Sequence, residues 1–175
     1  MQYIQYIDEY RSPLGKILMA ADESGLTGLW FEGQKYYAAS LGAEHEWRAL
    51  EVFAQTKRWL DRYFSGGRPG SLPPLHPAGT PFQIAVWESL SAIPYGRTAT
   101  YGEIAERVAE KLGKSHTSAR AVGSAVGRNR ISILIPCHRV VGADGSLTGY
   151  AGGLERKWKL LKLEGVDLSE AGRQL

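Results

Sequence analysis

The only cysteine of this 175-residue chain, Cys137, is the side chain best suited to covalent chemistry. An apolar run and Pro136 precede it, and His138 and Arg139 follow it directly. A free thiol has a pKa of about 8.5, so it needs a neighbouring base or positive charge to form a thiolate at neutral pH. The imidazole and the guanidinium can supply both. The spacing therefore makes Cys137 a candidate nucleophile; the alternative is a small buried apolar side chain.

The composition indicates a folded protein without disulfides. Hydrophobic residues make up 43% of the chain and charged residues 22%, which is typical of a globular domain. A single cysteine excludes an internal disulfide and any multi-cysteine zinc site. No apolar run is long enough to span a bilayer, and the N-terminus lacks the regions of a signal peptide. We therefore expect a cytoplasmic protein that does not contact a membrane.

Positive charge is concentrated in the part of the chain that contains Cys137. Residues 81–165 carry 12 Lys and Arg against 7 Asp and Glu, whereas residues 1–80 carry 8 against 9. Such an excess is expected where a region binds a polyanion such as nucleic acid. A basic solvated surface without a partner explains the charge equally well.

Residues 1–79 are predicted to form an N-terminal α/β lobe that ends in a linker. Three β-rich segments separated by turn residues predict an antiparallel meander. Apolar residues at helical spacing over residues 47–64 predict a helix that covers this sheet. Residues 66–79 are rich in Gly and Pro, which excludes a helix or a central strand. The expected strands are residues 3–7, 16–21 and 26–31.

Residues 80–175 are predicted to form a second, mainly helical lobe. Thr80 and Pro81 are typical of a helix cap and a first helical position. Thr100 and Glu103 have the spacing of a capping box, which predicts the start of a second helix.

Two helices on either side of a break at residues 113–117 form a candidate helix-turn-helix motif. The second of them, residues 118–127, carries small side chains around one long residue, Arg120. Small side chains allow a helix to approach a nucleic-acid groove closely, and close packing against another helix explains them equally well.

A strong turn signal follows the cysteine segment. Residues 142–146, which read Gly-Ala-Asp-Gly-Ser, predict a hairpin between residues 139–141 and 147–148. A hairpin that follows a helix-turn-helix motif indicates a winged-helix domain.

A last helix is predicted near the end of the chain. It covers residues 154–164, with Leu154, Trp158 and Leu161 on its inner side, and stops at a glycine. The polar residues 166–175 are expected to form a tail.

The order of these motifs resembles the O6-alkylguanine-DNA alkyltransferases, also called methylated-DNA–protein-cysteine methyltransferases. The signature Pro136-Cys137-His138-Arg139-Val140 is preceded by Asn129 and followed by Gly-Tyr-Ala-Gly-Gly at residues 149–153. Further matching motifs begin at Thr80, Ile93, Thr100 and Ala119. The resemblance is strong over residues 80–166 and loose over the first lobe. It implies an α/β (α+β) protein with a ribonuclease H-like lobe at residues 1–79 and a winged helix-turn-helix domain at residues 80–175.

The resemblance also implies a role for each matching residue. Cys137 is implied to be the acceptor that keeps the alkyl group, so that the protein acts once. His138 is implied to take the thiol proton through a bridging water, and Glu164 to orient that imidazole. The remaining implied residues are Asn129, which ties the helix-turn-helix to the cysteine segment; Tyr101, which lies near a phosphate and protonates the leaving guanine; Arg120, which fills the gap left by the flipped nucleotide; Ala121 and Gly123 on the same DNA-facing helix; and Pro136, Val140, Tyr150 and Gly152 in the alkylguanine pocket.

The implied function is repair of double-stranded DNA that contains O6-alkylguanine, with O4-alkylthymine as an alternative substrate and with base flipping. No cofactor is expected, and no metal, because the first lobe lacks the cysteine and histidine cluster that binds zinc in some members. A monomer is expected. Two other interpretations of the residues remain open. One is a winged-helix protein that binds DNA without reacting, and the other is a cysteine hydrolase that turns over repeatedly.

Overall fold

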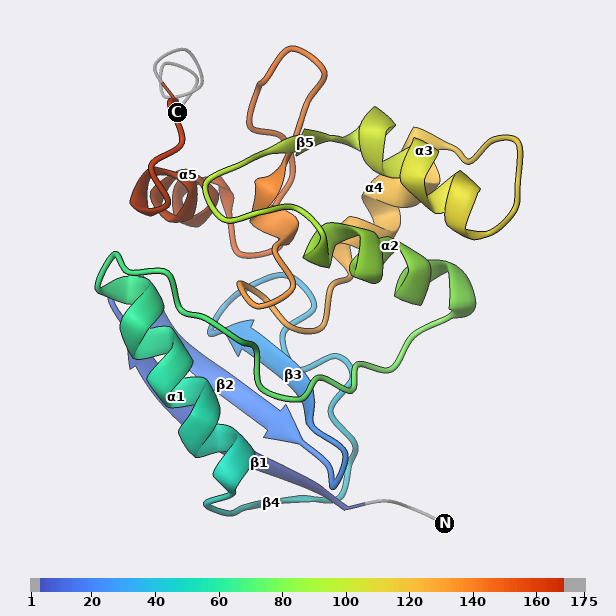
Figure 1. Ribbon diagram of the computed structural model, residues 1–175. Helices are drawn as coiled ribbons and strands as arrows, with labels where there is room; N and C mark the ends of the chain where they lie inside the picture. Colours follow the sequence, from blue (N-terminus) through green and yellow to red (C-terminus); the bar gives the residue numbers. More distant parts are fainter. Residues whose placement is uncertain (1–3, 169–175) are drawn as a thin grey trace. The chain divides into compact units, whose positions relative to one another are not determined.

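The computed structural model describes residues 4–168 and divides into two compact units (Figure 1). Within the described residues, the first unit contains the chain up to Ala78 and the short segment Arg130–Ser132. The second contains Gly79–Asn129 and the chain from Ile133 onward. The segment Arg130–Ser132 belongs to the first unit because it bonds to Leu29 through both of its ends. The Leu29 amide donates to the Arg130 carbonyl (2.8 Å), and the Ser132 amide donates to the Leu29 carbonyl (3.0 Å).

The first unit contains a four-stranded sheet with the order β3-β2-β1-β4. Strands β1 (Gln5–Ser12), β2 (Gly15–Ala21) and β3 (Leu26–Phe31) pair antiparallel, which confirms the predicted meander. Strand β4 (His45–Trp47) pairs parallel with β1. The sequence pattern does not predict this strand, because all three of its side chains are exposed and show no alternation.

Helix α1 (Glu51–Phe64) lies across one face of this sheet (Figure 1). It begins later than the predicted residue 47, because residues 45–47 are used by β4. The predicted linker is bound to the sheet as well. The Leu26 amide donates to the Pro74 carbonyl (2.9 Å), and the His76 amide donates to the Leu26 carbonyl (2.6 Å). The side chains that α1 buries are Phe53, Thr56, Trp59, Leu60 and Tyr63.

The second unit is mainly helical, and its first helix is fixed by a complete capping box. The Gln83 amide donates to Thr80 Oγ1 (3.1 Å), and the Thr80 amide donates to Gln83 Oε1 (3.0 Å). The mixed α/β class predicted from the sequence is therefore confirmed across the two units. The elements of this unit are α2 (Pro81–Ser91), β5 (Ala99–Thr100), α3 (Tyr101–Lys111), α4 (Ala119–Gly127), the short 3₁₀ helix η1 (Cys137–Arg139), β6 (Val140–Val141) and α5 (Leu154–Leu163).

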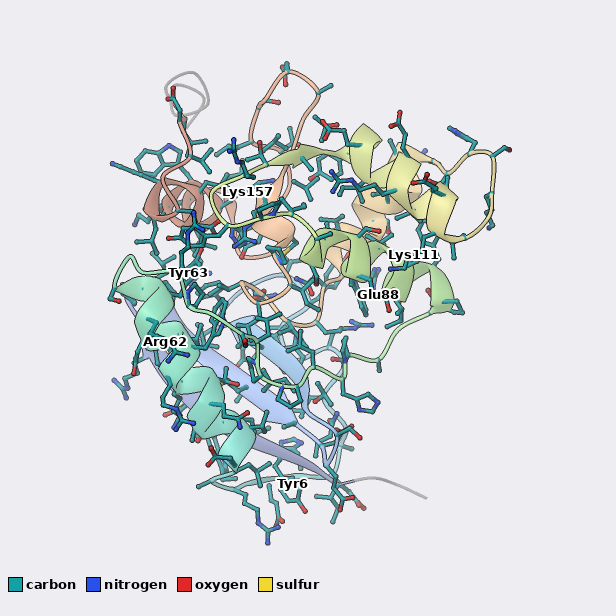
Figure 2. All side chains as sticks on the ribbon, in the orientation of Figure 1. Tyr6, Arg62, Tyr63, Glu88, Lys111 and Lys157 are labelled. Carbon is teal, nitrogen blue, oxygen red and sulfur yellow. The ribbon has the colours of Figure 1, made fainter. Side chains whose placement is uncertain are left out.

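Helices α2, α3 and α4 pack against one another and contain the predicted helix-turn-helix pair. The indole nitrogen of Trp87 donates to the Ala125 carbonyl (2.9 Å), which joins α2 to α4 in the core. On the surface, Glu88 and Lys111 form an ion pair between α2 and α3 (2.5 Å; Figure 2). The predicted inner side chains of α4, Val122, Ala125 and Val126, are buried.

The predicted hairpin after the cysteine segment is wrong in its strand pairing. The turn itself forms, since the Gly142 amide donates to the Ser146 carbonyl (2.9 Å). However, β6 pairs parallel with β5, and Leu147 and Thr148 form no strand. The physical reason is that Leu147 is buried in a cluster with Val141 and Leu161, while the Thr148 carbonyl accepts hydrogen bonds from side chains.

The inner face of α5 also differs from the prediction. Leu161 is buried as expected, but Leu154, at the first helical position, is 37% exposed. Trp158 is half-buried and packs against the cluster of Val141, Leu147 and Leu161, so Leu154 alone departs from the three predicted inner positions. The fully buried residues of this helix and its C-cap are Lys157, Leu160, Leu161 and Glu164. Of the predicted tail, residues 169–175 lie outside the described residues, as does Tyr3 of the first predicted strand. None of the helices in residues 4–168 combines the length and apolar character needed to cross a membrane.

Replacing Thr80 with Ala should lower the free energy of unfolding by about 1 kcal/mol, because one of the two capping hydrogen bonds of α2 is lost. Urea unfolding followed by circular dichroism measures the difference. Thr80→Ser keeps the hydroxyl and should stay close to the wild type. Equal losses in both variants would show that the hydroxyl bond does not stabilise α2.

Candidate active site around Cys137

Cys137 lies at the start of η1, immediately after a sharply turned backbone. Ile133 has φ +70°, a left-handed conformation that is strained for a β-branched residue. Pro136 has φ −82° and ψ 63°, and the Cys137 amide donates back to the Ile135 carbonyl (2.8 Å). This is an inverse γ-turn, and the fixed φ of proline suits its central position. The turn sets the direction in which the thiol leaves the backbone.

The side chain of Asn129 holds the thiol in place. Its Nδ2 donates to the Ile135 carbonyl (2.8 Å) and to Cys137 Sγ (3.2 Å). Asn129 follows directly after α4, so the end of this helix is bonded to the cysteine segment. Cys137 is only 4% exposed, and burial raises the pKa of its thiol, against the opposing effects of Asn129 and Lys157. The resting side chain is therefore a thiol, and a base must remove its proton.

Glu164 connects the residue after the cysteine to the end of α5. His138 Nε2 lies 2.5 Å from Glu164 Oε2, and both side chains are buried. Glu164 Oε1 accepts from Arg139 Nε (2.8 Å) and from the Gly96 amide (3.0 Å). Arg139 thus contacts Glu164 and does not serve as a direct partner of the thiol, which corrects the initial interpretation of its position next to Cys137.

The charge of this group follows from its contacts. Burial would raise the pKa of Glu164, but the hydrogen bonds of His138 and Arg139, the charge of Arg139 and, at a pH low enough to protonate the imidazole, the charge of His138 lower it to about 2. The pKa of His138 is lowered by burial and by the charges of Arg139 and Lys157, against the effect of Glu164. His138 is therefore neutral with its proton on Nε2, facing the carboxylate. Among the described residues, its Nδ1 has no hydrogen-bond partner, so a lone pair is available to accept a proton.

Lys157 is a functional candidate that the sequence analysis missed. Its side chain on α5 is fully buried, and Nζ donates to the carbonyls of Thr148 (2.9 Å) and Gly149 (3.2 Å; Figure 2). Burial lowers its pKa to about 8, and Cys137 partly opposes the shift. The signal that identifies it is its spacing, because it shares one helical face with Leu160, Leu161 and Glu164.

Tyr101 reaches the same loop from the start of α3. Its hydroxyl donates to the Thr148 carbonyl (3.0 Å), which also accepts from Lys157. A Cβ on Gly123 would lie 3.9 Å from the Tyr101 ring, and one on Gly149 would lie 3.8 Å from the Tyr101 hydroxyl oxygen. Burial raises the pKa of Tyr101, so the phenol keeps its proton at neutral pH.

The other residues predicted for the site fall into an exposed group on α4 and a largely buried group near Cys137 in the sequence and in the loop before α5. Arg120 and Ala121 are exposed in the first turn of α4, next to the half-buried Gly123. Pro136, Val140 and Gly152 are buried, and Tyr150 is half-buried. The structure thus brings Cys137, Asn129, His138 and Glu164 into one hydrogen-bonded group with Arg139, while Tyr101 and Lys157 share the Thr148 carbonyl.

In residues 4–168, no group of three or more His, Cys, Asp or Glu side chains is arranged to hold a metal ion.

Comparisons with known proteins agree with this architecture. The family model described as "6-O-methylguanine DNA methyltransferase, DNA binding domain" matches residues 81–166, and the "ribonuclease-like domain" of the same family matches residues 5–71. A methylated-DNA–protein-cysteine methyltransferase of Haemophilus influenzae is 42% identical over 170 residues, covering 97% of this chain and 91% of the relative. One from Methanosarcina acetivorans is 45% identical over 162 residues, covering 91% and 98%. The crystal structure of Mycobacterium tuberculosis OGT in complex with DNA has a TM-score of 0.77 at 39% identity, covering 92% of each chain.

The two family matches define a class of two-domain protein. A ribonuclease-like domain is followed by a DNA-binding domain, and the DNA-binding domain carries the buried cysteine. The chain belongs to the 6-O-methylguanine DNA methyltransferase family, as the identities over most of its length show. The resemblance inferred from the sequence motifs is thereby confirmed.

The pKa of Glu164 predicts a pH-dependent contribution to stability. Because this pKa falls from about 4.5 to about 2 on folding, the ionised carboxylate stabilises the folded state above about pH 5. The contribution, up to roughly 3 kcal/mol, is lost as the pH falls through 2. Urea unfolding between pH 7 and pH 3 should therefore show a smaller loss of stability for Glu164→Gln than for the wild type.

Glu164→Gln should also be less stable than the wild type at pH 7, because the buried Arg139 loses its counter-charge. Glu106→Gln, at an exposed position of α3, is the matched control and should keep the wild-type pH dependence. An unchanged pH dependence in Glu164→Gln would contradict the assignment.

Proposed function

We propose that this protein repairs DNA by transferring the alkyl group of O6-alkylguanine in double-stranded DNA to Cys137, once per protein molecule. The observation that carries the proposal is the buried thiol held by Asn129 next to a neutral histidine with a free Nδ1. Membership of the family supports the reaction type. The relative from Mycobacterium tuberculosis, whose structure is a complex with DNA, supports DNA as the partner.

In this proposal, His138 is the base and Glu164 fixes its tautomer. His138 Nε2 lies 2.5 Å from Glu164 Oε2, so the ring proton stays on Nε2 and Nδ1 keeps its lone pair. That lone pair receives the thiol proton through a bridging water. The imidazolium that forms is then stabilised by the same carboxylate. Because burial raises the pKa of Cys137, little thiolate exists before this transfer. The thiol is therefore protected from unspecific reactions until a substrate is present.

The thiolate then displaces guanine from the alkyl carbon. An Sγ–C bond forms as the C–O6 bond breaks, and the electron pair of the broken bond moves to guanine. Tyr101 supplies the proton that this leaving group needs, since its phenol remains protonated near the Thr148 loop. The product is a thioether, and its C–S bond is stable because a thiolate is a poor leaving group from an unactivated alkyl carbon. The alkyl group therefore stays on Cys137, and the protein is consumed.

Access to the O6 atom requires the nucleotide to leave the duplex, at a cost of a few kcal/mol. The exposed face of α4 suits a minor-groove approach, because Ala121 and the nearby Gly123 are small. Arg120 projects from the first turn of this face and, in the proposal, fills the gap left in the base stack. Pro136, Val140, Tyr150 and Gly152 line the pocket for the extruded base.

The proposal includes three further expectations from the sequence. We expect a monomer, a cytoplasmic location, and O4-alkylthymine as the alternative substrate.

Intact-mass spectrometry tests the proposed reaction directly. Incubation with one equivalent of a duplex that contains O6-methylguanine should add one methyl group to each protein molecule, and peptide mapping should place it on Cys137. Cys137→Ser should gain no mass and should keep nearly all its affinity for the duplex. A folded wild type that gains no mass would refute the proposal, and repeated turnover without a mass gain would indicate hydrolysis.

Arg120→Ala should slow repair of duplex DNA by about ten-fold, equivalent to ~1.4 kcal/mol of the cost of base extrusion. Its reaction with free O6-methylguanine should stay close to the wild-type rate, because a free base needs no extrusion. Single-turnover kinetics measure both rates, and Arg58→Ala on α1 is the matched control. Equal slowing on both substrates would rule out a role in extrusion.

A further inference from the structure

We propose that Arg139 is a positioning residue that keeps His138 in its neutral, proton-accepting form by neutralising the charge of Glu164. The inference deepens the proposed alkyl transfer, on which its kinetic consequence rests. Its structural premise concerns only the free protein and can be tested separately.

The contacts of Glu164 divide its carboxylate between two sets of partners. Oε1 accepts from Arg139 Nε (2.8 Å) and from the Gly96 amide (3.0 Å), and Oε2 faces His138 Nε2 (2.5 Å). Gly96 has φ +77°, and a Cβ there would lie 3.0 Å from the Glu164 carbonyl oxygen. A residue without a side chain is therefore needed for this amide to reach the carboxylate. Arg139 is therefore the ion-pair partner at Oε1, and Oε2 accepts the hydrogen bond from the imidazole.

Arg139 is held in this position by a second contact. Its NH1 donates to the Ile93 carbonyl (2.7 Å), and its guanidinium lies 5.8 Å from the centre of the Tyr95 ring. The side chain is 10% exposed. Two different nitrogen atoms of one planar group therefore join Glu164 to the loop after α2, which a lysine ammonium cannot reproduce with a single nitrogen.

The charge balance explains why this matters for the base. A buried carboxylate whose only partner is an imidazole favours the imidazolium, because the positive charge then has a counter-charge. With Arg139 present, Glu164 already has one positive partner. A second positive charge on His138 would be repelled by Arg139 and by Lys157, and burial disfavours it further. The imidazole therefore stays neutral.

The charges that act on the imidazole come from Glu164, Arg139 and Lys157. Its own segment contributes Cys137 and Arg139, and α5 contributes Lys157 and Glu164. Helix α2 also packs against η1, but its single charged residue, Glu88, forms an ion pair with Lys111 (Figure 2). Arg139 therefore both bonds to Glu164 and disfavours a charged His138.

The consequence is a shift of the pH range in which the protein reacts. Without Arg139, Glu164 would hold His138 as an imidazolium near neutral pH, and Nδ1 would carry a proton in place of a lone pair. The rate would then rise only at higher pH, where this proton is lost.

The kinetic test compares Arg139→Met, which keeps the apolar stem, with Arg139→Lys, which keeps the charge. Single-turnover methyl transfer from free O6-methylguanine is measured from pH 5 to pH 9. For Arg139→Met, the midpoint of the acid limb should move up by about one pH unit, so that the rate below it falls about ten-fold and recovers at high pH. Arg139→Lys should shift less, and Arg58→Met on α1 should not shift. An equal loss at every pH, or an equal shift in both variants at position 139, would overturn the proposal.

The ¹⁵N chemical shifts of the His138 ring provide a test that needs no alkyl transfer, and a neutral ring in a folded Arg139→Met variant at pH 7 would overturn the inference. At pH 7, the wild type should show a neutral ring with its proton on Nε2, and Arg139→Met should show an imidazolium. Signals are assigned with His138→Gln. An imidazolium in the wild type at pH 7 would overturn the inference about Arg139. Absence of methyl transfer in a wild type with the expected neutral ring would refute the proposed function and leave the inference about Arg139 standing.

Discussion

The arrangement of the site depends on the hydrogen bonds and ion pair that the buried Glu164 carboxylate forms. It accepts hydrogen bonds from the loop after α2, through Gly96, and from both residues that follow the cysteine, His138 and Arg139. A buried charge is unfavourable unless it is paired and hydrogen-bonded. The carboxylate is therefore stable only when the loop after α2, the residues after the cysteine and the end of α5 meet. The interaction that orders this part of the fold also fixes the tautomer of the proposed base.

In this site, the Cys137 thiol is the proposed reactive group, and His138 and Glu164 are the groups proposed to activate it. The thiol is held by Asn129 and kept protonated by burial, so in the proposed mechanism its reactivity depends on transfer of a proton to His138. Lys157 and Tyr101 meet at the Thr148 carbonyl, on the loop that leads to Tyr150. A protein that reacts once benefits from this arrangement, because a permanently ionised thiol would be lost to other electrophiles.

The sequence predicted those elements correctly whose formation depends on a short stretch of chain. The capping residues Thr80 and Thr100 place two helix starts correctly, and the alternation of β-forming and turn residues gives the meander. It failed where the partner is distant in the chain. Strand β6 pairs with β5 about forty residues earlier, so the turn signal at residues 142–146 predicted the wrong partner for residues 140–141.

The sequence by itself determined the candidate nucleophile, because one cysteine stands in a motif of proline, histidine and arginine. It also determined the helix-turn-helix pair. Only the tertiary structure decided how the charges are paired. Arg139 is adjacent to the histidine in sequence but contacts Glu164 at the end of α5. Lys157 is buried and donates to the backbone carbonyls of Thr148 and Gly149. Electrostatic partners are selected by distance in space and by burial, and neither quantity can be obtained from residue spacing along the chain.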